Sequence, residues 1–243
     1  MAKRFNNCKC IHCLEYFAEL TSDHVFPASW YPETTPQDKE KWQAPACDEC
    51  NKKLGEIEEK LLLKFGLSIN PFRYESAGIT KKVLRSLKSN HGRNKKDKRI
   101  REKKRKKILR EAIVPTDVPL SSIFPNFGFH YNIQPKDQLA LLVPEKGIKT
   151  IGEKIIRGIT WVFDAQYIEK EYKIDIYFFH ENMDNPFLQF LNKFGKLYSI
   201  EPGIRITRAM AKEDKICGIY SIEIWSQLKM YGTVTLRNNK KMA

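Results

Sequence analysis

The chain of 243 residues lacks long hydrophobic runs, and none approaches the roughly 18–20 apolar residues that a membrane span needs. Its first residues, MAKRFNNCKC, also lack the apolar core of a secretory signal. We therefore expect no membrane partner and a cytoplasmic location. The composition, 42% hydrophobic and 12% aromatic, is ordinary for a folded protein with a buried core.

Acidic residues are scarce between Lys81 and Arg110, where sixteen Lys and Arg stand against Asp97 and Glu102 alone. The whole chain has 43 basic and 29 acidic residues, so this segment accounts for the net charge of +14. Such a density of one sign favours binding to a nucleic-acid backbone. The residues expected to contact nucleic acid are Arg93, Lys95, Lys96, Lys98, Arg99, Arg101, Lys103, Lys104, Arg105, Lys106 and Lys107.

Aromatic residues are absent between Lys81 and Ile113, which argues against base stacking on single strands. Contact with the phosphates of double-stranded DNA is the simpler expectation, and it supplies affinity and positioning rather than sequence choice. The alternative for this segment is a solvated charged helix or linker.

Cysteine is present in six copies, and without an export signal these thiols are expected to be reduced or to bind metal. Two CxxC pairs, Cys10–Cys13 and Cys47–Cys50, have the spacing of knuckles that each give two ligands to a tetrahedral zinc. Four thiolates close the coordination shell, so we expect one structural zinc per chain. Cys8 and Cys217 are left over.

The residues beside the cysteines suggest a reactive site in addition to a structural metal site. Asp23 and His24 lie between the two CxxC pairs, and Asn51 follows Cys50 directly at the start of an expected helix that ends near Gly66. His12, inside the first knuckle, is expected to be a solvent-exposed spacer. Four prolines within 25–46 predict loop with short extended pieces there.

The segments CIHCLEYFAELTSDHVFPASW and APACDECNKKLGEIEEKL resemble the zinc-knuckle subclass of the HNH (His-Me finger) endonuclease family. The resemblance covers roughly residues 8–65 and implies a ββα-metal fold with His24 at the end of a strand. It implies His24 as the general base that activates water, and Asp23 and Asn51 as ligands of one catalytic Mg²⁺ or Mn²⁺. Such a cation would polarise the scissile phosphate and stabilise the leaving oxygen.

The chain departs from the family at the middle asparagine, because residues 25–46 contain no Asn. Gln43 lies near that place and can supply an equivalent amide. Glu58, two helical turns after Asn51, is expected either in the outer shell of the site or as a solvated surface carboxylate.

We predict an α+β chain in three parts. Residues 1–70 form the zinc-stapled HNH domain, 71–112 a basic arm with a helix near 99–113, and 113–243 an α+β domain with a mixed or mainly antiparallel sheet. In the last part, strands are expected at 139–143, 172–179, 203–209, 216–225 and 233–236, and helices at 151–168 and 185–194, the second capped by Asn185.

The resulting functional prediction is a divalent-metal-dependent endonuclease that hydrolyses phosphodiester bonds in DNA. A non-catalytic zinc protein that only binds DNA, and a nuclease directed at RNA, are the alternatives. The last part is expected to serve recognition, dimerisation or docking to a protein partner.

Overall fold

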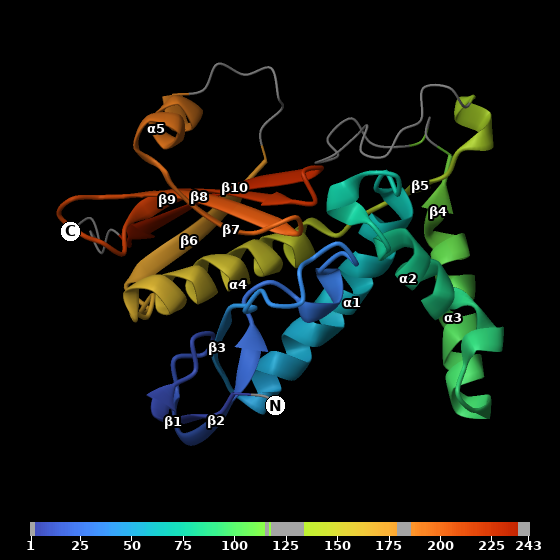
Figure 1. Cartoon of the computed structure of the whole chain (residues 1–243), viewed down its shortest axis with the longest axis horizontal. Helices are drawn as coiled ribbons and strands as arrows, with labels where there is room; N and C mark the ends of the chain where they lie inside the picture. Colours follow the sequence, from blue (N-terminus) through green and yellow to red (C-terminus); the bar gives the residue numbers. More distant parts are fainter. Residues whose placement is uncertain (1–2, 115–116, 118–133, 179–185, 238–243) are drawn as a thin grey trace, which may run out of the picture.

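A computed structural model describes residues 3–114, 117, 134–178 and 186–237. It is an α+β structure in which every paired strand runs antiparallel to its neighbour, which confirms the expected class. Figure 1 shows the N-terminal strands at one end, the five-stranded sheet at the other, and a long helix, α4, between them.

The first part of the chain builds a three-stranded sheet followed by a helix. The strands are ordered β1-β2-β3, and the helix begins two residues after β3 ends. The helix was expected to end near Gly66, but it continues to Ser68. A Cβ on Gly66 would lie 2.6 Å from Cγ2 of Val83, so this glycine permits close helix packing instead of ending the helix. The elements are β1 (Phe5–Lys9), β2 (Tyr16–His24), β3 (Gln43–Ala46) and α1 (Asp48–Ser68).

The basic part is helical and packs on the first part. Its second helix is capped by Asn94, whose side chain accepts a hydrogen bond of 2.9 Å from the backbone NH of Asp97. The expected helix near 99–113 therefore exists but starts earlier. The elements are α2 (Ile79–Leu87) and α3 (Lys95–Glu111), and α3 leads into a small two-stranded sheet of β4 (Ala112–Ile113) and β5 (Ala140–Leu141).

The last part holds a five-stranded sheet in the order β6-β10-β9-β8-β7, with α4 and α5 on opposite sides of it (Figure 1). The helix expected at 151–168 is shifted, since α4 begins at Glu145 and ends where Ala165 takes a left-handed φ of 53°. The strand β7 was not expected, and Asn185 lies outside the described residues. The elements are α4 (Glu145–Asp164), β6 (Tyr172–Tyr177), α5 (Pro186–Phe194), β7 (Lys196–Ile200), β8 (Ile204–Met210), β9 (Gly218–Ile224) and β10 (Leu228–Leu236).

Side chains from the first and last parts share one hydrophobic core. The indole NH of Trp225 donates a hydrogen bond of 2.8 Å to the backbone oxygen of Trp30, and the two ring centroids are 5.5 Å apart. Both indoles are fully buried, so they join the sheet to the loop that follows β2. The division into three domains remains a prediction, and this core crosses its boundaries.

Helix α4 approaches its two neighbours closely through glycines. A Cβ on Gly152 would lie 2.8 Å from Ile176 of the large sheet, and a Cβ on Gly158 would lie 2.6 Å from Val25, next to His24. The helix is therefore held between the sheet and the end of β2. Within the described residues, no helix is both long enough and apolar enough to cross a membrane.

Candidate active site

Four cysteine sulfurs form a compact cluster where the β1–β2 turn meets the start of α1. Their Sγ atoms all lie within 4.8 Å of one another, and Cys13 Sγ is 3.9 Å from Cys47 Sγ. A tetrahedral zinc with sulfurs at about 2.3 Å places those sulfurs about 3.8 Å apart, which matches this spacing. Cys10, Cys13, Cys47 and Cys50 thus fit the expected structural zinc, and neither Cys8 nor Cys217 belongs to the cluster.

The chain forms the knuckles through local backbone geometry. The NH of Cys10 bonds to the oxygen of Glu15, and the NH of Leu14, at φ 65°, bonds back to the oxygen of Cys10. On the other side, Cys47 is the N-cap residue of α1, and its NH lies 3.4 Å from Cys10 Sγ. The two knuckles therefore bring the end of β3 and the start of α1 to the β1–β2 turn.

His24 is the last residue of β2, directly across from Gln43 at the start of β3. The Gln43 amide nitrogen is 3.4 Å from His24 Nε2, so Gln43 contacts the imidazole itself rather than only its loop. Burial lowers the pKa of His24, and Lys154 and Lys41 add to this effect while Asp23 opposes it. A half-buried imidazole with a lowered pKa is mostly neutral at pH 7, as a general base must be.

Asn51 lies in the first turn of α1, where its side chain faces the strand that carries Asp23 and His24. Its Nδ2 donates a hydrogen bond of 3.4 Å to the backbone oxygen of Ser22. The structure therefore brings Asn51 to the end of β2, within one residue of the Asp-His pair.

Asp23 is buried, with only 6% of its surface exposed, and both of its carboxylate oxygens have partners. Oδ2 lies 3.0 Å from His12 Nε2, and Oδ1 lies 2.7 Å from Lys154 Nζ. Burial by itself raises the pKa of Asp23, but the bonds from His12 and Lys154 outweigh it and lower that pKa. Asp23 is therefore a buried, ionised carboxylate whose charge is already balanced.

The expectation for His12 was wrong, because its side chain is only 10% exposed. The knuckle turns this histidine inward, toward β2, where its ring meets Asp23. Burial lowers the pKa of His12, and the neighbouring carboxylate opposes that shift. His12 thus connects the zinc knuckle to the buried carboxylate.

Glu58 is not a solvated surface group, since its side chain is 15% exposed and forms an ion pair with Lys154. Burial raises the pKa of Glu58, against the lowering effect of Lys154. The Lys154 ammonium lies between two carboxylates, Asp23 from β2 and Glu58 from α1, and its own side chain is 1% exposed.

Lys154 belongs to α4, and sequence reasoning did not assign it to the site. A signal was present, since Lys154 stands on the buried stripe of its helix, between Ile151 and Ile155, where a lysine is expected only with partners. The buried stripe does not identify the carboxylates that pair with this lysine.

The basic helix α3 uses part of its charge to attach itself to the rest of the molecule. Lys104 forms an ion pair with Glu59 of α1, and Arg101 donates a hydrogen bond of 2.8 Å to the backbone oxygen of Arg85. Lys106 and Lys107 pair with acidic residues of their own helix. These four residues are therefore less free to bind phosphate than the sequence suggested.

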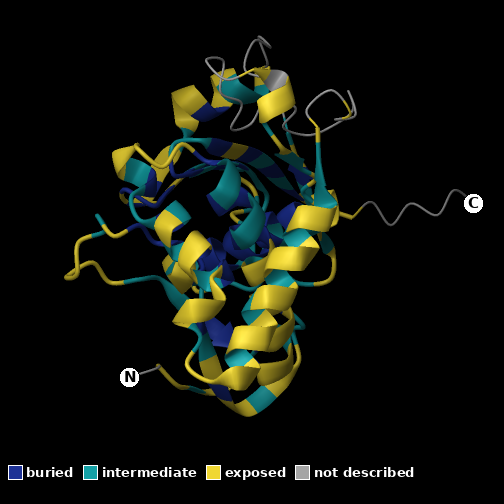
Figure 2. Cartoon of the chain, turned by 90° about the vertical axis from the view of Figure 1, so that its right-hand side faces the viewer, coloured by how far each residue is buried: buried dark blue, intermediate teal, exposed yellow. Residues whose placement is uncertain are grey.

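Seven of the expected nucleic-acid contacts are exposed and form no ion pair with any described residue. Figure 2 shows that the helices on this side of the molecule present a largely exposed surface to solvent. These seven residues are Arg93, Lys95, Lys96, Lys98, Arg99, Lys103 and Arg105.

The four cysteines are the only group of three or more potential metal-binding His, Cys, Asp or Glu side chains in the described parts of the chain.

Comparisons with protein-family models, with curated proteins and with solved structures found no match for this chain. The functional assignment therefore depends on the residues and their geometry.

Proposed function

We propose that the chain is an endonuclease of the HNH type that hydrolyses phosphodiester bonds in DNA, built on a zinc-stapled ββα-metal unit of β2, β3 and α1. The observation that carries the proposal is that Asn51, next to Cys50 of the four-cysteine cluster, donates a hydrogen bond to the backbone of β2 at Ser22, directly before Asp23 and His24. A module that only binds nucleic acid has no need of this trio.

His24 is the base in the proposed reaction. Its neutral imidazole takes a proton from a water molecule as the water oxygen bonds to phosphorus and the bond to the 3′ oxygen breaks. The leaving oxygen then takes a proton from solvent. Gln43, whose side-chain amide lies 3.4 Å from His24 Nε2, positions the ring; with the amide turned so that its oxygen accepts from Nε2–H, the lone pair of Nδ1 is free to take the proton.

The expected cation site does not fit the residues as they stand in this arrangement. Asp23 is buried, and its two oxygens already bind His12 and Lys154. The requirement for Mg²⁺ or Mn²⁺ therefore enters the proposal from the family resemblance, whereas the zinc fits its four cysteines.

Double-stranded DNA is the proposed substrate because α3 presents exposed cations without interleaved aromatic residues. Lys98 and Lys103, for example, are exposed and form no ion pair with the described residues. Such cations bind phosphates irrespective of sequence.

A plasmid-nicking assay with Mg²⁺ or Mn²⁺ tests the proposal by comparing the wild type with His24→Ala. We expect nicking by the wild type and a loss of at least about a hundredfold in the variant, the usual contribution of a general base. Equal cleavage by both proteins would remove His24 from the mechanism. A structured RNA tested in parallel distinguishes a nuclease directed at RNA.

A second candidate, a zinc protein that binds DNA without cutting it, is favoured by one observation. The Asp23 carboxylate is already neutralised by Lys154, as in a structural ion pair. Binding of DNA by both proteins, with no cleavage of DNA or RNA under any of these conditions, would support this candidate.

A further inference from the structure

We propose that Lys41 binds the phosphate that DNA presents to His24, so that its ammonium stabilises the negative charge that develops on this phosphate during cleavage. This inference rests on the proposed function, in which His24 activates a water molecule. Lys41 lies in the loop between β2 and β3, outside the basic segment from Lys81 to Arg110, so charge density in the sequence does not single it out.

The backbone places Lys41 on the same face of the small sheet as the imidazole. The NH of Val25 donates a hydrogen bond of 3.0 Å to the oxygen of Trp42, so the pairing of β2 with β3 continues one residue beyond His24 and Gln43. Side chains two residues apart on an extended chain point to one face, and Gln43 contacts the His24 ring. Burial is the main cause of the lowered pKa of His24, and Lys41 is one of the cations that add to it.

An aromatic ring, and not an acidic residue, holds the Lys41 ammonium. Its Nζ is 4.9 Å from the centroid of the Tyr31 ring, and Lys41 forms no ion pair with any residue that the structure describes. Tyr31 is only 4% exposed, so its ring is a fixed support. A cation–π contact orients an ammonium without neutralising it, which leaves the charge available to an anion.

A second lysine fixes this support and adds positive charge beside it. Lys82 of α2 donates hydrogen bonds of 2.8 Å to the backbone oxygen of Ser29 and 3.3 Å to that of Tyr31. Burial lowers the pKa of Lys82, an effect that Glu33 opposes and Lys41 strengthens. The two ammonium groups therefore repel each other, and a bound phosphate would relieve that repulsion. Because Lys82 is committed to backbone oxygens, Lys41 is the one that can reach the substrate.

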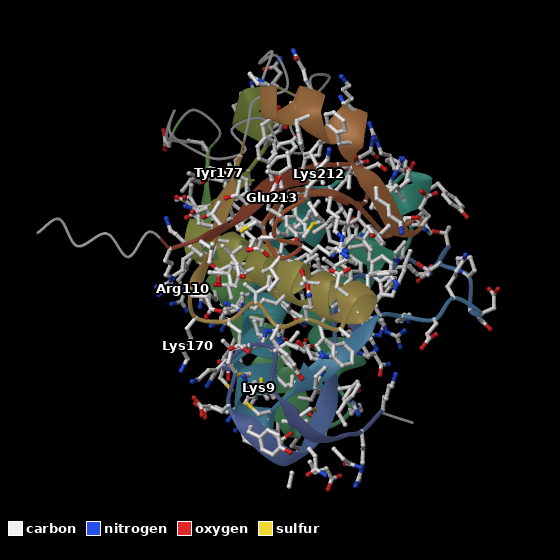
Figure 3. The ribbon with its side chains drawn as sticks, turned by 90° about the vertical axis from the view of Figure 1, so that its left-hand side faces the viewer. Lys9, Arg110, Lys170, Tyr177, Lys212 and Glu213 are labelled. Carbon is white, nitrogen blue, oxygen red and sulfur yellow. The ribbon has the colours of Figure 1, made fainter. Side chains whose placement is uncertain are left out.

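Other lysines near the small sheet are already neutralised. Lys9 and Lys170, on the side of the molecule shown in Figure 3, both pair with acidic residues. Lys154 is 1% exposed and is bound to Asp23, which leaves it out of reach of a substrate. Lys41 is therefore the ammonium that can bind a non-bridging oxygen of the phosphate and stabilise its added charge as water bonds to phosphorus.

The kinetic test replaces Lys41 with Met, which keeps an unbranched side chain and removes the charge. We expect nicking to slow about a hundredfold, the usual loss when one group that stabilises developing charge is removed. The affinity for DNA should change little, because one phosphate contact among several is lost. Lys41→Arg keeps the charge and should restore activity above that of Lys41→Met. Lys39→Met is the matched control, since Lys39 is exposed in the same loop, and it should nick DNA like the wild type.

A second measurement detects the contact without cleavage. The zinc-loaded full-length His24→Ala variant, which should leave the substrate intact, is treated with an acetylating reagent in the presence and absence of a short DNA duplex. Mass spectrometry then follows each lysine. We expect the acetylation of Lys41 to be lost when the duplex is bound. Lys170, whose side chain is 78% exposed, should be acetylated equally in both samples.

Unchanged acetylation of Lys41 on a chain that binds the duplex would overturn the proposal, as would undiminished nicking by Lys41→Met. Circular dichroism and zinc content show whether each variant is folded, and Lys41→Gln takes the place of Lys41→Met if the latter is not. Protection of Lys41 in a chain that nicks no DNA would refute the proposed reaction while supporting this phosphate contact, so the two failures are distinguishable.

Discussion

Lys154 and Asp23 are 131 positions apart in the chain, yet the ammonium nitrogen of one lies 2.7 Å from a carboxylate oxygen of the other. The contact joins the last part of the chain to the candidate site in the first. The region after the basic helix therefore has a structural part in the site, whatever it also does in recognition or association.

The cysteine cluster predicts a strict dependence of the fold on zinc. Replacing Cys47 and Cys50 with Ser removes two of four thiolates, and we expect the zinc content to fall from about one per chain to none, with loss of cooperative unfolding. Elemental analysis and thermal melts measure both. Cys217→Ser is the control. Because Cys217 lies outside the cluster, this variant should retain its zinc.

The exposed cations of α3 predict a steep salt dependence of DNA binding. Arg99→Ala/Lys103→Ala removes two cations one turn apart, and each lost phosphate contact should reduce the log–log slope of affinity against salt by about 0.9. Fluorescence anisotropy at several salt concentrations measures this slope. Lys149→Ala, on α4 and paired with Glu145, should leave the slope unchanged, and an unaltered slope in the double variant would exclude this face of α3 as the binding surface.

Gly158 predicts that close contact between α4 and the end of β2 contributes to stability. In Gly158→Ala the added methyl would lie 2.6 Å from Val25, and overpacking of this kind costs about 1–3 kcal/mol. The expected result is a lower melting temperature. Gly147→Ala, on the same helix, is the matched control. Its added methyl would lie no closer than 3.5 Å to any neighbouring atom, so this variant should have the melting temperature of the wild type.

The paired indoles predict that the first and last parts of the chain unfold together. Trp225→Ala removes a fully buried side chain and its hydrogen bond to Trp30, and we expect a loss of about 3–5 kcal/mol in the free energy of unfolding. Denaturant titration followed by circular dichroism gives this value. Phe72→Ala serves for comparison, because Phe72 is 92% exposed and should contribute little.

Local patterns in the sequence predicted the features that depend on neighbouring residues. The CxxC spacing indicated the cysteine cluster, and the helix expected to start at Asn51 exists as α1, with Leu54 and Leu61 among its buried side chains. Gly66 was misread as a helix stop because its function, close contact with Val83 of α2, depends on a second helix.

Features that depend on distant residues could not be read in this way. The partners of Lys154 are set by the placement of α4 between the large sheet and β2, which no local pattern encodes. His12 was misplaced for a similar reason, since the direction in which a knuckle turns its middle residues depends on what packs beside it. The short strand β7 follows α5 after one residue and gave no separate signal.

The long separation between Asp23 and its counter-ion also has a consequence during protein synthesis. The ribosome produces the cysteines, Asp23 and His24 first, and more than a hundred further residues must emerge before α4 is complete. Domains fold as they emerge, at about 5–20 residues per second. A nascent chain therefore spends several seconds with its Asp-His strand made but without the lysine that neutralises it, and the site reaches its final charge only late in translation.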